Sequence, residues 1–390
     1  LPMKHRFILR ILIASLGINL AWGFSLPSSA QTQFQNPLEV QEFNDPLLPN
    51  PPVSRPLSPL EKFRLEQALD QLNQQARNRY QQGNIAGAFE IWYRELRLRQ
   101  KLEPIQEVKA LGRVGEIAWS ENRSQDFRNI KQRLQTIETT AKNNDHRELM
   151  KALAKTYEQM RALDRAIAIY QNLVKESANP TSILEKTAQL YEQQFAYKEA
   201  ANLYEKLLEN ATEKNNTVAK INYLSNLKYL YEQGNKPEQG ITVKQRLIEL
   251  YQQQNNKQAL PGLMVALGED YAQTNQGNQA SRTYQNAFDL AWSQQKYAIA
   301  SDALSSLAQL YRKDGSLDTT LQIYEQLLIV HRQSSDHYGL MMTYDQIGQL
   351  HQQQDQAQKA ITAYENALQI AQSLNYQQDY FQQKIQQLKS

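Results

Sequence analysis

The chain has 390 residues, with 43 lysines and arginines, 40 aspartates and glutamates, 14 glycines and no cysteine. The absence of cysteine excludes disulfides, thiolate metal sites and cysteine nucleophiles. Lys4, Arg6 and Arg10 stand upstream of Gln31 in a segment that holds no acidic residue, so the remaining chain is formally neutral. A neutral chain has no overall field to attract polyanions, and the sequence therefore predicts no nucleic-acid partner.

Residues 3–30 have the layout of a secretory signal peptide. Basic residues follow Met3, an apolar run extends from Ile11 to Phe24, and small residues precede a cleavage point before Gln31. The run is shorter than the roughly 20 residues that cross a bilayer. We therefore expect an exported protein, located in a bacterial periplasm or outside the cell. The alternative is an uncleaved anchor, which would make the chain a membrane-tethered binding or assembly subunit of an envelope complex; only then is membrane contact expected.

Residues 31–58 are rich in proline, which cannot sustain a helix and favours extended backbone. This composition predicts a semi-rigid, largely disordered linker, with a docking motif for a proline-reading partner as the alternative. Helical structure is predicted to begin at residue 59. Ser58, Pro59 and Glu61 there provide a capping box with proline in the first turn.

One spacing pattern recurs six times between residues 150 and 375. A small residue is followed by an aromatic after three positions, a second small residue nine later, and a second aromatic four further on. The first position is occupied by Ala154, Ala188, Lys228, Gly268, Ala308 and Gly348. The first interval, from Ala154 to Ala188, is slightly shorter than the next four, which are equal. A fixed period of this size predicts a solenoid of stacked helical hairpins, in which small residues let helices approach and large ones fill the space beside them.

The unit around Lys228, Gly240 and Lys244 is the least regular of the six, because two of its pattern positions carry lysine. It is predicted to form a local bend or a weak point of the array. Five apolar residues near the end of the chain form a helical stripe: Tyr376, Tyr380, Phe381, Ile385 and Leu388. A solenoid needs a cap at each end, so residues 376–388 are predicted to form a C-terminal capping helix. A self-association or membrane-surface helix is the alternative.

Leu267-Gly268, Tyr271, Ala280, Tyr284 and Ala287 resemble the signature of the tetratricopeptide repeat. The resemblance implies an all-α fold, a right-handed superhelical α-solenoid of tandem helix-turn-helix units. With two weaker units upstream, it covers about eight repeats within residues 59–375, starting near residues 69, 108, 147, 181, 221, 261, 301 and 341. Four units are longer than the family's usual repeat, which predicts longer second helices. The signal segment, proline-rich linker and glutamine-rich repeats together are similar to exported repeat proteins of cyanobacteria.

The resemblance also implies a concave groove, whose wall in this family is built by first-helix residues at fixed distances from the small position. Carried over by position, the candidates are Lys151, Lys155, Glu158, Glu185, Gln189, Glu192, Ser225, Tyr229, Glu232, Val265, Glu269, Ala272, Ser305, Gln309, Arg312, Asp345, Gln349 and Gln352. The Lys/Asn/Arg cluster of the family's carboxylate-clamp members is missing, so the acidic C-terminus of a chaperone is not the expected ligand. A mixed polar wall predicts that a peptide or protein segment binds in the groove, the alternative for each residue being solvated helix surface.

No residue set in the sequence predicts catalysis, a cofactor or a metal. His331 and His337 flank a loop without a carboxylate at ligand spacing, so packing is the favoured interpretation and weak metal capture the alternative. The glycines stand singly at repeat positions, and nothing indicates a phosphate loop or a nucleophile elbow. The sequence therefore predicts a non-catalytic scaffold without a cofactor, whose partner is a protein or peptide.

Overall fold

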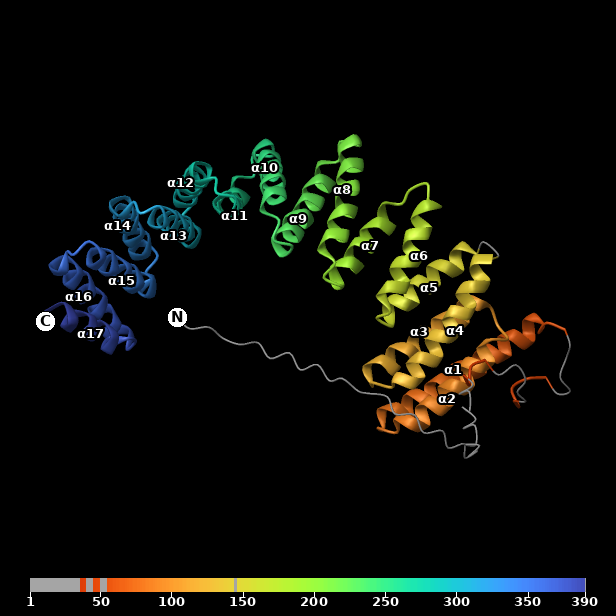
Figure 1. The fold of residues 1–390 in the computed structure, drawn as a ribbon. Helices are drawn as coiled ribbons and strands as arrows, with labels where there is room; N and C mark the ends of the chain where they lie inside the picture. Colours follow the sequence, from red (N-terminus) through yellow and green to blue (C-terminus); the bar gives the residue numbers. More distant parts are fainter. Residues whose placement is uncertain (1–35, 40–44, 50–54, 144–145, 390) are drawn as a thin grey trace, which may run out of the picture.

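The protein is an arch of paired helices, as Figure 1 shows for a computed structural model of the chain. The structure describes residues 36–39, 45–49, 55–143 and 146–389, and within these ranges it contains α-helices, one short 3-10 helix and no strand. The all-α repeat solenoid expected from the period is therefore confirmed. The expected signal peptide at residues 3–30 lies outside the described residues. Among the helices that are described, none combines the length and the apolar character needed to cross a membrane.

Eight helical hairpins follow one another along the described part of the chain. The first helices of the hairpins are α1 (Pro59–Gln81), α3 (Pro104–Ser120), α5 (Arg147–Gln159), α7 (Thr181–Gln193), α9 (Thr217–Gln233), α11 (Leu260–Gln273), α13 (Tyr297–Lys313) and α15 (His337–Gln353). The second helices are α2 (Ile85–Arg99), α4 (Ser124–Asn143), α6 (Leu163–Lys175), α8 (Tyr197–Glu213), α10 (Pro237–Gln253), α12 (Gly277–Ser293), α14 (Leu317–Gln333) and α16 (Ala357–Leu374). The 3-10 helix η1 (Lys257–Ala259) precedes α11, and α17 (Gln378–Lys389) ends the array.

The extra residues of the long units lengthen both helices of a hairpin. The second helix α6 has 13 residues, whereas α8 and α10 have 17 each. The first helices lengthen as well, from 13 residues in α7 to 17 in α9. The sequence pattern placed the added turn in the second helices alone, because only there do apolar residues visibly continue past the repeat signature.

Small side chains mark the helix crossings, as the period requires. The alanines at these places are fully buried: Ala154, Ala166, Ala188, Ala200, Ala280, Ala308 and Ala360. At Gly268 a Cβ atom would lie 2.5 Å from the ring of Tyr284, and at Gly348 it would lie 2.6 Å from the ring of Tyr364. In these two hairpins the aromatic ring of the second helix therefore packs directly on the backbone of the first helix, and this contact fixes the shape of the hairpin.

Most turns inside and between hairpins end the preceding helix with a residue in the left-handed region. Asn235 is one of them, with φ 50. Its N–H donates to the Glu232 carbonyl at 3.2 Å, and the next N–H, of Lys236, donates to the Tyr231 carbonyl at 2.8 Å. This bonding satisfies the last carbonyls of the helix and suits asparagine or glycine. Asparagine takes the place at Asn122, Asn215, Asn235, Asn255, Asn275 and Asn375.

Replacing Phe195 by glycine is expected to stabilise the protein. Phe195 adopts φ 58 and is 75 % exposed, so its ring gains little burial while its Cβ opposes the left-handed backbone. Glycine has no Cβ and adopts this backbone conformation without strain. The substitution should therefore raise the free energy of unfolding by about 1 kcal/mol, as measured by urea denaturation. Gly315 has φ 76 and open space around it, so Gly315→Phe should lower the free energy of unfolding by a similar amount. Equal stabilities of both variants and the parent protein would contradict this explanation.

Each end of the array is covered by residues outside the eight hairpins. At the C-terminal end α17 packs on α16, with Phe381 fully buried and Ile385 8 % exposed, whereas Tyr376 of the expected stripe is 46 % exposed. At the N-terminal end Leu47, Leu48 and Leu57 pack against the apolar cluster of α1, which includes Leu65 and Leu69. Burial of these exposed end faces is what keeps a solenoid from associating end to end.

Candidate protein interface on the concave face

From α7 to α15 the first helices lie along the inner side of the arch and the second helices along the outer side (Figure 1). Half of the predicted groove residues are solvent-exposed on these first helices and on α5: Lys151, Lys155, Gln189, Tyr229, Glu232, Glu269, Ser305, Gln309 and Gln352. Their side chains are mostly polar, and Tyr229, 47 % exposed, is the large apolar group among them. The surface therefore offers many hydrogen-bonding groups and few apolar anchors.

Several predicted groove carboxylates lie beside tyrosines of the repeats themselves. Burial, followed by the nearby Glu158 carboxylate, raises the pKa of Tyr170 to about 12. Tyr204 lies in the same way beside Glu192, with its pKa also raised mainly by burial. The Tyr223 hydroxyl donates to Glu185. Glu185 thus accepts a hydrogen bond from a phenol that would otherwise be buried without a partner, and it helps to hold neighbouring hairpins together.

The irregular unit is held by a buried ion cluster in place of the usual tyrosine. Lys244 occupies the position that carries tyrosine in the other five units, and its side chain is 1 % exposed. Its Nζ lies 2.7 Å from Oδ2 of Asp270 and 3.0 Å from Oε1 of Glu232. Gly240 leaves space for Asp270, because a Cβ at that glycine would lie 2.5 Å from Asp270 Oδ2. Glu232 is thus a groove residue with a structural bond, and Asp270 is a partner that the sequence pattern did not identify.

Some of the predicted residues do not present their side chains to the groove. Asp345 is 5 % exposed, and it accepts hydrogen bonds from Tyr380 at 3.1 Å and from Gln349 at 2.9 Å. Val265 is 8 % exposed and belongs to the apolar core. Arg312 donates to the Gln346 side chain at 2.5 Å. Carrying over family positions places these residues on the correct helices but does not reveal which of them the next hairpin covers.

Of the two histidines near the loop after α14, His331 is a buried packing residue, whereas His337 is solvent-exposed. His331 is 6 % exposed, and its Nδ1 lies 2.9 Å from Oδ2 of Asp336. Burial lowers the pKa of His331, and the Asp336 carboxylate opposes that shift. Within the residues that the structure describes, no three histidine or carboxylate side chains are grouped so as to hold a metal ion.

Two short turns upstream of α1 have the same local structure. In residues 36–39 the Leu38 N–H donates to Asn36 Oδ1 at 3.0 Å, and the Glu39 N–H donates to the Asn36 carbonyl at 2.9 Å. In residues 45–48 the Leu47 N–H donates to Asp45 Oδ1 at 3.0 Å, and the Leu48 N–H donates to the Asp45 carbonyl at 3.0 Å. Both are turns opened by an Asn or Asp side chain, followed by proline and leucine. We call them the first and the second Asx-Pro-Leu turn.

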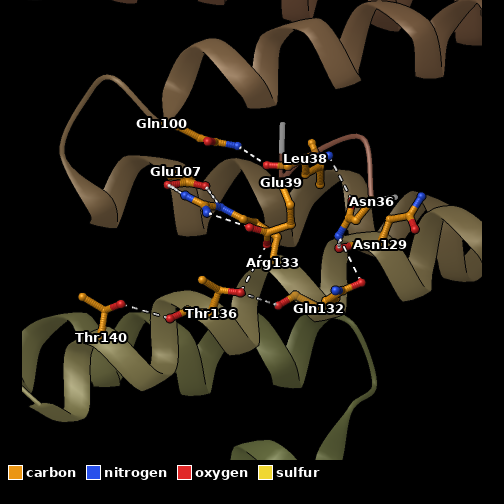
Figure 2. A network of polar contacts seen from close by, with 10 residues as sticks. All are labelled: Asn36, Leu38, Glu39, Gln100, Glu107, Asn129, Gln132, Arg133, Thr136 and Thr140. Carbon is orange, nitrogen blue, oxygen red and sulfur yellow. Dashed lines mark hydrogen bonds and ion pairs between the residues drawn. The ribbon is translucent and has the colours of Figure 1, made fainter. Parts of the chain in front are cut away.

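The first turn inserts between the C-terminal end of α2 and the helix α4 (Figure 2). Leu38 is fully buried there, and its carbonyl accepts a hydrogen bond from Gln100 at 2.7 Å. Asn36 donates to the Asn129 carbonyl at 2.8 Å. Glu39 accepts from Thr136 at 3.2 Å and lies 3.5 Å from Arg133, which is also bonded to Glu107 (Figure 2). The groove thus recognises both the leucine side chain and the polar edges of the turn.

The second turn docks on α2 through an ion pair, since Asp45 accepts two hydrogen bonds from Arg94 at 2.7 and 2.9 Å. The two bound turns differ from the disordered linker that the proline content predicts for residues 31–58. Proline excludes helix but also pre-forms a turn, and Leu38, Leu47 and Leu48 supply apolar surface to bury. The signal that could have been used is the repetition of Asx-Pro-Leu within a short stretch of sequence.

Comparison with known proteins finds the repeat family in the C-terminal third of the chain. Residues 299–373, which contain nearly all of α13 to α16, match the tetratricopeptide repeat family model. No curated protein matches the sequence.

Solved structures resemble the chain at low identity. A signal-transduction ATPase with a tetratricopeptide repeat sensor from Pyrococcus horikoshii has 15 % identity and a TM-score of 0.41, covering 74 % of this chain and 47 % of that one. The C-terminal part of a TPR repeat-containing protein from Cytophaga hutchinsonii has 14 % identity and a TM-score of 0.41, covering 66 % and 95 %. BtubC from P. vanneervenii has 16 % identity and a TM-score of 0.39, covering 55 % and 90 %. Residues 299–373 thus match tetratricopeptide repeats, and helical hairpins of the same pattern continue along the rest of the described array.

Proposed function

We propose that the chain is an exported, non-catalytic scaffold that holds an extended peptide or protein segment along its concave face. Tetratricopeptide repeats mediate interactions between proteins, and this coarse function applies to the chain through its repeats. The observation that carries the finer proposal is the row of exposed polar side chains on successive first helices, from Lys155 on α5 to Gln352 on α15. A partner in extended conformation would meet hydrogen-bonding groups from one hairpin after another.

Tyr229 is the residue on which a binding test is best built. It is 47 % exposed on the first helix α9, and Ile329 is 54 % exposed on the second helix α14, so the two form a matched pair on opposite sides of the arch. Peptides selected from a displayed random library against the full chain are expected to lose at least about tenfold in affinity with Tyr229→Ala, by loss of buried apolar area. Ile329→Ala should leave the affinity unchanged. Peptides that are sensitive only to Ile329→Ala would move the binding surface to the outer side.

Export is supported by the basic, apolar and small-residue segments of residues 3–30. The mature protein is then expected to begin at Gln31. Mass spectrometry of the N-terminus after expression in a bacterium with a periplasm tests this directly. A protein that retains residues 3–30 and stays with the membrane fraction would favour an anchored subunit.

A further inference from the structure

The groove that holds the first Asx-Pro-Leu turn has a counterpart one unit further along the array. The two successive units begin near residues 108 and 147. Residues that lie at equal distances from these two starts are therefore equivalent. The buried residues Leu111, Ile130 and Leu134 of the first unit thereby correspond to Met150, Ile169 and Leu173 of the second. All six belong with Leu38 to one continuous apolar cluster. The polar residues Glu107 and Arg133 at the first groove correspond to His146 and Asn172. The equivalent residues thus lie between α4 and α6.

A cavity of about 170 Å³ lies at this second place. Its lining includes the exposed basic residues Lys142, Arg147 and Lys175, beside the acidic Glu176. All five corresponding residues named above are in this lining. Pockets for small-molecule ligands measure about 300–1,000 Å³, so this volume suits a single apolar side chain rather than a metabolite.

We propose that the cleft between α4 and α6 binds an Asx-Pro-Leu turn of another protein, with the leucine in the cavity and a following acidic residue at the rim. The chain itself shows the chemistry of the occupant, because the equivalent groove takes Leu38 with Glu39 beside a basic side chain. The rim of the second cleft carries Arg147 and Lys175 on its exposed edge, which complements an acidic residue.

The occupant of the second cleft comes from outside the described chain. The first turn fills the groove between α2 and α4, and the second turn is bound to Arg94 and to the apolar cluster of α1. Both Asx-Pro-Leu turns of the sequence are therefore already bound within the molecule. None of the predicted groove residues lines this cleft.

The proposal is tested with the synthetic peptide Gln-Asn-Pro-Leu-Glu-Val and the full chain, by titration calorimetry. The wild-type protein is expected to bind one equivalent. Asn172→Trp places a large ring at an exposed position of the rim and should weaken binding about tenfold or more, as should leucine-to-aspartate replacement in the peptide. Lys206→Trp, at the corresponding exposed position of α8, is the matched control and should leave binding unchanged. Circular dichroism verifies that both variants keep their helices.

A second variant tests the equivalence of the two grooves. Leu38→Asp should release the first turn, so that the number of bound peptides rises from one to two. Three results would overturn the proposal: no binding to the wild-type chain, binding that Asn172→Trp leaves unchanged, or binding only after Leu38→Asp. A dimer of the peptide-free chain that dissociates with Asn172→Trp, seen by sedimentation, would assign the cleft to a second copy and equally overturn it.

Discussion

Replacing Lys244 by alanine is expected to lower the free energy of unfolding by about 3–5 kcal/mol, because it leaves a buried carboxylate without its cation. The Asp270 side chain is 9 % exposed, and Lys244 Nζ is its partner at 2.7 Å. The loss should appear in urea denaturation at neutral pH as an earlier transition of the middle of the array. In a solenoid each hairpin is supported only by its neighbours, so a weak unit there separates the two halves.

The same variant is expected to recover stability in acid. Burial already raises the pKa of Asp270 in the folded protein, and the loss of Lys244 removes the main opposing influence. A raised folded pKa means that protonation of Asp270 favours the folded state, so the defect of Lys244→Ala should grow as the pH rises above 4 and shrink below it. A defect of equal size at pH 4 and pH 7 would contradict an origin in the Asp270 charge.

Two controls separate the buried ion pair from general effects at this unit. The double change Lys244→Met with Asp270→Leu removes both charges and should cost far less than Lys244→Ala alone, since apolar replacements of buried pairs are often neutral. Lys228→Ala removes a surface cation 3.6 Å from Glu232, and such pairs contribute about 0–1 kcal/mol. Comparable losses in all three variants would mean that any substitution in this region destabilises the array, and that the ion pair is not the cause.

This cluster shows what the repeat pattern could and could not predict. The period located Lys244 at a tyrosine position and marked its unit as irregular, because a deviation stands out against five regular neighbours. It did not identify Asp270, since an acidic residue on a helix surface is the ordinary case and its burial depends on the neighbouring hairpin. Only the structure shows that Asp270 pairs with the buried Lys244 and that Gly240 leaves room for this contact.

The sequence placed the groove candidates on the first helices more reliably than it predicted which of their side chains are exposed. Family positions placed the candidates on first helices because that choice depends on the period alone. Whether a side chain is exposed, as for Gln309, or buried, as for Asp345, depends on the angle between successive hairpins. That angle results from packing and is not encoded by the spacing of one unit.

The bound N-terminal turns were missed for a different reason. Proline content describes what a segment cannot form, and it favoured a linker for residues 31–58. The groove that receives Leu38 is made by residues far downstream in the sequence, such as Gln100 and Thr136. Amino-acid composition describes only the segment itself, whereas this contact joins residues that are far apart in the sequence.

Replacing Trp92 by alanine is expected to lower the free energy of unfolding of the N-terminal hairpins by about 3–5 kcal/mol. Trp92 is fully buried, its ring meets Phe89 edge-on at 5.2 Å between centroids, and its Nε1 donates to Asn73 at 3.2 Å. Truncation would leave a large cavity between α1 and α2. It would also remove the hydrogen-bond donor of the Asn73 side-chain oxygen. Urea denaturation followed by tyrosine fluorescence should show a first transition that is absent from the parent protein.

Trp119→Ala is the matched control, because Trp119 lies on the neighbouring hairpin but is 54 % exposed, with its ring 5.7 Å from Phe127. Its loss should cost less than about 1 kcal/mol, as is usual for surface positions. The Trp92 defect should also reach the N-terminal turns, since α2 carries Arg94 and ends beside Gln100. Hydrogen exchange at Leu38 and Leu47 should therefore accelerate in Trp92→Ala and not in Trp119→Ala. Unchanged exchange at these two amides would mean that the turns are held independently of α2.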